Sequence, residues 1–285
     1  DESNGSIDLY NPYISVINNI SHDHKSIAEL QQLFQNLGNR TKHAVVINDD
    51  YETCRTITHQ HKITFSLQNP QADFYAENIR TLPHGTAYDL DGKTFTLKLI
   101  GRFNVANALA AIAACNAMGV DKYAAAEILE DFSGTKRRLD VIGQKNGITV
   151  IDDFAHNPDK ITASVSALRQ YSGRLLIMFQ PHGFSPMRSM GKEIIESFIK
   201  NMQPEDILVM PEIFFVGGTV TKDISSADLI NYAYKLGKQN AYFAADKQQA
   251  AEMLLKEAKS GDRIVIMGAR DNSLTNLCKL ILERL

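Results

Sequence analysis

Four short apolar runs in the second half of the chain limit its possible folds more than any other feature. They occupy residues 148–152, 175–179, 207–210 and 263–267, and helices are predicted in two of the three intervals between them. A short run that is apolar throughout is typical of a strand buried on both faces, as in a parallel sheet with helices packed on each side. We therefore predict that residues 139–285 form a Rossmann-like, mostly parallel, three-layer α/β domain.

The helices between these runs carry recognisable end signals. Asn157 followed by Pro158 supplies a capping side chain and a first-turn proline for a helix that is expected to run to about residue 171. Two more helices are predicted at 247–259 and 273–285. An alternation of strands and helices of this kind is typical of an α/β domain.

The first half of the chain reads as a second α/β unit. Strands are predicted near 13–20 and 44–48, with an amphipathic helix between them, and an alanine-rich helix is predicted at 104–118. The pair Asp91–Gly92 between two β-rich runs indicates a hairpin. The polar segment 133–138 is the best candidate for a connector, so the first domain is predicted to span residues 1–138.

Charge and cysteine content exclude several classes of partner. The 30 basic and 33 acidic side chains give a formal charge of −3, so no nucleic-acid partner is expected. The longest apolar run, near 108–120, is shorter than the roughly 20 residues that cross a bilayer. The three cysteines are widely spaced, which favours free thiols in a reducing compartment, and we expect a cytoplasmic protein.

Polar residues follow three of the predicted parallel strands. The strands ending near 152, 179 and 267 run into the segments DFAHN, QPHGF and GARDN, and Arg188 lies just beyond the second. The carboxyl ends of parallel strands meet at one edge of a sheet, where ligands of such folds bind. Ordinary loops would explain any one of these segments, but three together predict a polar cleft.

Two shorter signals have competing explanations. The residues His22, Asp23 and His24 open a helix after a strand, so they form either a capping turn or part of a metal site. The tripeptide at 92–94 resembles the end of a phosphate-binding loop, but its setting in a hairpin argues against that function. No GxGxxG dinucleotide signature occurs.

Six segments, taken in order, resemble one protein family. They are DESN at the start of the chain, NISHDH at 19–24, GRFNVANALAA at 101–111, GTKRRLD at 134–140, DDFAHNP at 152–158 and FQPH at 179–182. This combination resembles the Mur ligases, which are ATP-dependent amide-forming enzymes of cell-wall precursor synthesis. The resemblance covers nearly the whole chain.

The resemblance implies a fold and an activity. Residues 1–138 would be an N-terminally truncated, P-loop-type central ATPase domain, and residues 139–285 the C-terminal Mur ligase domain. The FQPH segment and the spacing around Gly134–Thr135 are most similar to those in one branch of the family. The enzymes of this branch join L-alanine to UDP-N-acetylmuramate through an acyl phosphate. The cofactors would be ATP and Mg²⁺. The partners would be a UDP-sugar precursor and an amino acid, and the protein would be a monomer or weak homodimer.

The resemblance also assigns site residues by motif position. His24, and with less support Glu2, match magnesium ligands, while His182 and Arg188 match positions that orient the acceptor, with His156 at the cleft. The nucleotide-contacting positions would be Asn104, Asn107, Arg138, Asp153 and Asn157.

The chain also departs from the pattern of this family. The glycine-rich phosphate loop and the UDP-binding domain would precede Asp1, so the chain by itself is expected to be inactive. Gly183 and Pro186 stand where the L-alanine branch carries arginines, and the HNP segment at 156–158 is closer to peptide-adding branches. Two alternatives therefore remain open. One is a ligase for another amino acid or a peptide, and the other is a non-catalytic nucleotide-binding relative.

Overall fold

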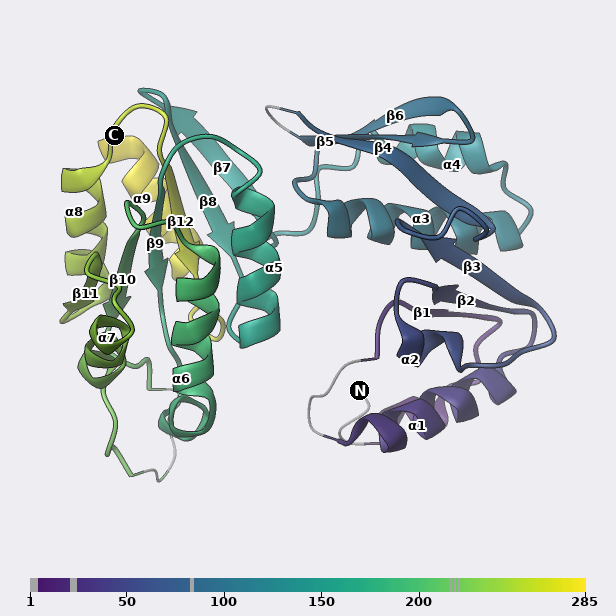
Figure 1. Cartoon of the computed structure of the whole chain (residues 1–285), viewed down its shortest axis with the longest axis horizontal. Coiled ribbons are helices and arrows are strands. Elements are labelled where there is room, and N and C mark those ends of the chain that lie inside the picture. Colours follow the sequence, from purple (N-terminus) through teal and green to yellow (C-terminus); the bar gives the residue numbers. More distant parts are fainter. Residues whose placement is uncertain (1–4, 21–24, 83–84, 216, 218, 220) are drawn as a thin grey trace. The chain divides into compact units, whose positions relative to one another are not determined.

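The computed structural model describes residues 5–20, 25–82, 85–215, 217, 219 and 221–285. The chain divides into two compact units, Asp1–Ser133 and Gly134–Leu285, each with its own sheet and core (Figure 1). Among the helices of the described ranges, none combines the length and the apolar character that a bilayer crossing requires.

The first unit contains a six-stranded sheet in the order β1-β2-β3-β4-β5-β6. The first four strands pair in parallel, and β5 pairs antiparallel with both β4 and β6. Their bounds are β1 Ile14–Ile17, β2 Ala44–Asn48, β3 Lys62–Ser66, β4 Phe74–Leu82, β5 Gly85–Leu90 and β6 Lys93–Leu97.

Helices cover both faces of this sheet because β2 is apolar on both sides. Ala44 and Val46 pack with one helical layer, whereas Val45 and Ile47 pack with the other. The first layer holds α3 (Arg102–Ala117) and α4 (Lys122–Leu129), and the second holds α1 (Ile27–Arg40) and α2 (Glu52–Arg55). A short 3₁₀ helix, η1, spans Ser6–Leu9.

The predicted hairpin at Asp91–Gly92 is confirmed, and it joins β5 to β6. Both turn residues have positive φ, 49° and 76°, as a two-residue type I′ turn requires. The lysine and threonine that follow lie in β6, so this segment is a strand and not a phosphate-binding loop.

The second unit contains a six-stranded sheet in the order β11-β10-β9-β12-β8-β7, in which only β7 is antiparallel. The mostly parallel α/β architecture predicted for this half of the chain is confirmed. The bounds are β7 Asp140–Lys145, β8 Ile148–Asp153, β9 Leu175–Phe179, β10 Ile207–Pro211, β11 Ala241–Ala244 and β12 Arg263–Met267.

The sheet of the second unit lies between α5 and α6 on one face and α8 and α9 on the other (Figure 1). The helices are α5 Pro158–Leu168, α6 Phe184–Asn201, α7 Ser226–Lys235, α8 Lys247–Glu257 and α9 Leu274–Arg284. The predicted cap of α5 is confirmed, since the Asn157 side chain accepts a hydrogen bond from the Lys160 N–H at 3.0 Å. Sequence patterning missed α6, so Arg188 lies on a helix and not in a loop.

The connector between the units bonds to the second one. The guanidinium of Arg137 donates to the Gly268 carbonyl oxygen at 2.6 Å, and the Leu139 N–H donates to Asp153 Oδ1 at 3.3 Å. The division between the units therefore falls after Ser133, slightly before the expected boundary at Arg138.

The core of the first unit contains an orphaned hydroxyl group. Tyr88 is fully buried, and no hydrogen-bond partner for its hydroxyl lies among the residues that the structure describes. Burial raises the pKa of this phenol to about 12. We expect Tyr88→Phe to increase the free energy of unfolding by about 1 kcal/mol, because it removes a desolvated polar group without creating a cavity.

Urea unfolding followed by circular dichroism measures this effect. Tyr234→Phe is the matched control, because the hydroxyl of Tyr234 donates to the Ala241 carbonyl oxygen at 2.6 Å. Losing this hydrogen bond is expected to lower the free energy of unfolding by about 1 kcal/mol. A Tyr88→Phe variant that is less stable than the parent protein would contradict the prediction.

Candidate functional site

The carboxyl edge of the second sheet brings together polar residues that are distant in sequence. The strand order β9-β12-β8 places the segments containing His182, Arg270 and His156 side by side. The imidazole rings of His156 and His182 lie 5.6 Å apart between centroids, in an edge-to-face arrangement. The three polar segments thus lie at one edge, as predicted, and the predicted cleft at this edge stays a prediction.

Both histidines at this edge favour the neutral form. Burial, followed by the charges of His156 and Arg270, lowers the pKa of His182 to about 4. Burial is also the main cause that lowers the pKa of His156. The Nδ1 of His156 donates to the Phe154 carbonyl oxygen at 2.8 Å, which leaves its Nε2 as an acceptor. The Nδ1 of His182 is buried and has no hydrogen-bond partner in the described part of the chain.

Two buried aspartates end β8 beneath these histidines. Asp152 accepts hydrogen bonds from the Thr275 hydroxyl at 2.5 Å and from Arg137 Nε at 3.4 Å. Asp153 Oδ2 has no hydrogen-bond partner among the described residues, whereas Oδ1 accepts from the Leu139 N–H. Burial raises the pKa of both carboxyl groups.

The backbone at this edge is strained. Arg137, Leu139 and Arg270 have positive φ values of 60°, 48° and 66°. A side chain in this left-handed region costs about 1 kcal/mol relative to glycine, and such residues cluster at functional sites. Arg137 escaped the sequence analysis, although its place beside Arg138 in the connector was a usable signal.

Three other predicted residues of this unit have identified neighbours. The Arg138 guanidinium lies 5.7 Å from the centroid of the Phe154 ring. On α6, the Nη1 of Arg188 donates to the Thr221 carbonyl oxygen at 2.9 Å and pairs with Asp223. Asn157 caps α5. Their assigned contacts with nucleotide and acceptor stay predictions.

A second polar site lies in the first unit. A cavity of about 340 Å³ opens at the carboxyl ends of β1, β2 and β3 and reaches the first turns of α3. Its lining residues are Asn18, Asn19, Asn48, Asp50, Tyr51, Leu67, Gln68, Arg102, Phe103, Ala106 and Asn107. The cavity therefore lies where open α/β sheets bind their ligands.

A chain of asparagine amides runs along this cavity. The side-chain amide of Asn18 donates to Asn107 Oδ1 at 2.7 Å, and that of Asn107 donates to Asn104 Oδ1 at 3.3 Å. The side-chain amide of Asn48 donates to Asn18 Oδ1 at 3.5 Å. Asn104 also donates to the Ile100 carbonyl oxygen at 2.9 Å, which fixes it at the start of α3. The two predicted asparagines of α3 thus lie close together, with Asn18 and Asn48 as unpredicted neighbours.

The predicted magnesium ligands cannot be placed. Glu2 and His24 both lie outside the described residues. Within the described ranges, no group of three or more histidine, cysteine, aspartate or glutamate side chains is arranged to hold a metal ion.

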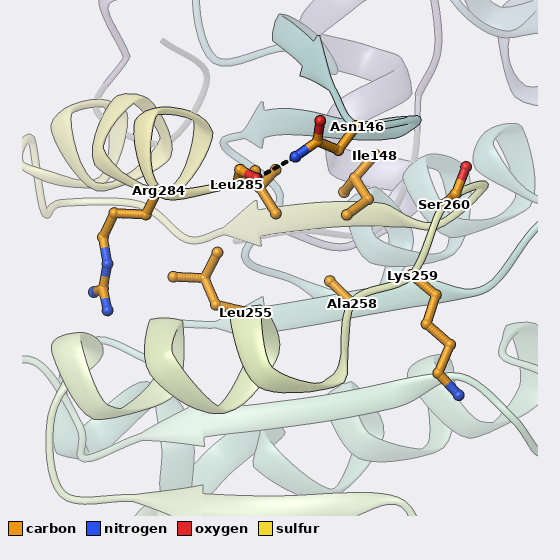
Figure 2. Close-up of a pocket in the computed structure, with 8 residues that line it drawn as sticks. All are labelled: Asn146, Ile148, Leu255, Ala258, Lys259, Ser260, Arg284 and Leu285. Carbon is orange, nitrogen blue, oxygen red and sulfur yellow. Dashed lines mark hydrogen bonds between the residues drawn. The ribbon is translucent and has the colours of Figure 1, made fainter.

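Another cavity, of about 400 Å³, lies at the opposite, amino edge of the second sheet (Figure 2). Its lining residues are Asn146, Ile148, Leu255, Ala258, Lys259, Ser260, Arg284 and Leu285. Figure 2 shows the amide of Asn146 bonded to the main-chain carbonyl of Leu285. None of the predicted site residues lines this cavity.

The chain belongs to the Mur ligase family. Residues 2–115 match the family profile described as the Mur ligase middle domain, and residues 137–270 match the profile described as the Mur ligase glutamate ligase domain. Together the two profiles cover most of the chain, one in each structural unit.

A named relative and two solved structures show the same likeness. The chain is 30% identical over 286 aligned residues to the UDP-N-acetylmuramate–L-alanine ligase of Pelotomaculum thermopropionicum, covering 95% of the chain and 61% of that relative. The UDP-N-acetylmuramate–alanine ligase of Thermotoga maritima matches with a TM-score of 0.76 and 23% identity, covering 100% of this chain and 62% of the other.

A third match is the MurF ligase of Thermotoga maritima in complex with ADP. The TM-score is 0.68 at 14% identity, and the match covers 97% of this chain and 62% of the other. The chain thus spans about three fifths of the length of these proteins. At these identities the two solved structures support the fold alone.

Proposed function

We propose that the chain is part of an ATP-dependent ligase that joins L-alanine to UDP-N-acetylmuramate. The observation that carries this proposal is the match along 95% of the chain to a relative of that name. In this proposal the first unit binds ATP and the second binds the acceptor amino acid. Bound ATP would supply the phosphoryl group that activates the sugar carboxylate as an acyl phosphate.

The asparagine chain of the first unit supports nucleotide binding. A purine base presents both donors and acceptors on its edge, and an asparagine amide pairs with both. Asn107 is exposed at the rim of the cavity, and its neighbours Asn18 and Asn104 fix the orientation of its amide. The exposed guanidinium of Arg102 lines the same cavity and adds a positive charge for phosphates.

The histidine pair of the second unit supports acceptor binding. An amine attacks an acyl group only as the free base, and a neutral imidazole accepts a proton where an imidazolium cannot. His156 presents an unprotonated Nε2 at this edge, and His182 is held neutral beside it. We therefore propose that His156 and His182 orient the acceptor amine.

The test measures ADP release from ATP with UDP-N-acetylmuramate and, in turn, L-alanine, glycine, L-serine, D-glutamate and an L-alanyl peptide. The 285-residue chain and its full natural gene product are assayed side by side. Only the full product is expected to turn over, with L-alanine the best acceptor. Preference for another acceptor would favour the alternative ligase, and nucleotide binding without turnover by the full product would favour a non-catalytic relative.

Asn107→Ala is expected to weaken ADP binding by about 10- to 100-fold, because it removes the central amide of the chain. Isothermal titration calorimetry on the 285-residue chain measures this affinity. Asn116→Ala is the matched control, since Asn116 lies on the same helix and donates to the Val120 carbonyl oxygen away from the cavity. Equal ADP affinity in the Asn107 variant and the parent protein would remove the proposed role of Asn107.

A further inference from the structure

Three cations at or near the carboxyl edge of the second sheet already have partners. Arg137 bonds to Asp152 and the Gly268 carbonyl, Arg188 bonds to Asp223 and Thr221, and Lys247 pairs with Asp271 at 2.7 Å. These bonds hold protein segments together. A ligand that needed one of these cations would first have to break such a bond.

Arg270 differs from these residues. It is exposed, and it makes no hydrogen bond or ion pair with any residue of the described ranges. It follows β12, the strand that lies between β9 and β8, so it emerges between the segments that carry His182 and His156. Its charge acts on both imidazoles.

The backbone conformation of Arg270 adds a second observation. Its φ of 66° lies in the left-handed region, where glycine is the unstrained residue. The chain therefore keeps a long cationic side chain at a position where its backbone is strained. Such an outlier points to function, because stability alone would favour glycine.

We propose that Arg270 binds the α-carboxylate of the acceptor amino acid, with His156 and His182 facing the amino group. The proposal rests on the proposed function, since it identifies the residue that selects a free amino acid as acceptor. A guanidinium pairs with a carboxylate through two parallel hydrogen bonds.

The neighbours of Arg270 favour a zwitterion over a phosphate. The Nε2 of His156 carries a lone pair, because its Nδ1 donates to the Phe154 carbonyl oxygen, and the charge of Arg270 acts on this imidazole. An acceptor nitrogen of this kind would repel phosphate oxygens but would accept a hydrogen bond from an amine. An α-amino acid carries an anionic group and an N–H group a few bonds apart, which matches an exposed guanidinium near a neutral imidazole.

The test is a titration of the 285-residue chain followed by NMR of the imidazole C–H resonances, with His182→Gln used to assign its signal. L-Alanine is expected to shift the resonances of His156 and His182, whereas L-alaninamide, which lacks the carboxylate, is not. Arg270→Gly is expected to weaken L-alanine binding at least tenfold. Because glycine relieves the strained φ, this variant should melt no lower than the parent protein, so lost binding is not lost folding.

Arg270→Lys keeps the charge and is expected to recover part of the affinity, while Arg284→Gln, at the opposite edge, should bind as the parent protein does. Equal binding of L-alanine by Arg270→Gly and the parent protein would overturn the proposal. So would equal binding of L-alaninamide, or shifts caused by inorganic phosphate but not by L-alanine. Calorimetry with ADP on the same variants reports on the first unit, so failure at Arg270 is distinguishable from failure of the proposed function.

Discussion

Asp206→Ala is expected to lower the free energy of unfolding of the second unit by about 3–5 kcal/mol, because it breaks a buried network of charged groups. Asp206 has no exposed surface. Its carboxylate accepts hydrogen bonds from the Leu175 N–H at 2.8 Å and the Gln203 N–H at 2.7 Å, and it pairs with Arg169 at 3.3 Å. Alanine would leave two backbone donors and one guanidinium without this partner.

The neighbouring Lys238 adds to this effect. Lys238 is 7% exposed, and its ammonium group donates to the main-chain carbonyl oxygens of Asp206 at 2.6 Å and Gln203 at 2.7 Å. A shift of the turn at 203–206 would therefore also leave a buried ammonium group poorly solvated.

Urea unfolding curves of Asp206→Ala and of a control variant measure the loss in the free energy of unfolding. Glu205→Ala is the matched control, since Glu205 is the exposed neighbour of Asp206, and its change should stay within about 0.5 kcal/mol. A loss below 1 kcal/mol in Asp206→Ala would show that the network contributes little to the stability of this unit.

His182 is expected to make the stability of the second unit depend on pH. Its pKa is about 4 in the folded protein, whereas a histidine in an unfolded chain has a pKa of about 6.5. Below about pH 6.5 the unfolded chain binds a proton that the folded protein does not. The contribution of His182 is therefore fully present above that pH and is lost as the pH falls toward 4.

Between pH 7 and pH 5 the free energy of unfolding of the second unit is expected to fall by about 2 kcal/mol more in the parent protein than in His182→Gln, because glutamine does not titrate. Urea unfolding at a series of pH values gives both curves. His61→Gln, in the first unit, serves as control and should follow the parent protein. Parallel curves for His182→Gln and the parent protein would show that the folded pKa of His182 is close to the ordinary value.

The sequence predicted the edge of the second unit well because its signals are local. A continuous apolar strand followed by polar residues identifies the carboxyl end of a parallel strand, and this held for His156 and His182. The strand order that places Arg270 between them is a property of the whole sheet, and no pattern in one segment encodes it.

Other features escaped prediction for physical reasons. The helix α6 begins directly after Gly183 and contains Pro186 in its first turn. Proline is tolerated in the first turn of a helix, but in a sequence a glycine and a proline so close together resemble a loop. Asn18 and Asn48 come from separate strands and meet near α3 only after folding. Arg188 was predicted from its position in a family motif. Its bonds to Thr221 and Asp223 could not be predicted, because these residues lie in a loop more than 30 residues further along the chain.

The position of β12 also affects the order in which the second unit assembles. This strand is made last, yet it pairs with β8 on one side and β9 on the other, matching Arg263 to Thr149 and to Leu175. During synthesis one edge of β8 and one edge of β9 therefore stay unpaired until residues 263–267 emerge, whereas the first unit builds its sheet from strands that are neighbours in sequence. Folding on the ribosome is expected to proceed one unit at a time, with the candidate acceptor edge formed at the final step.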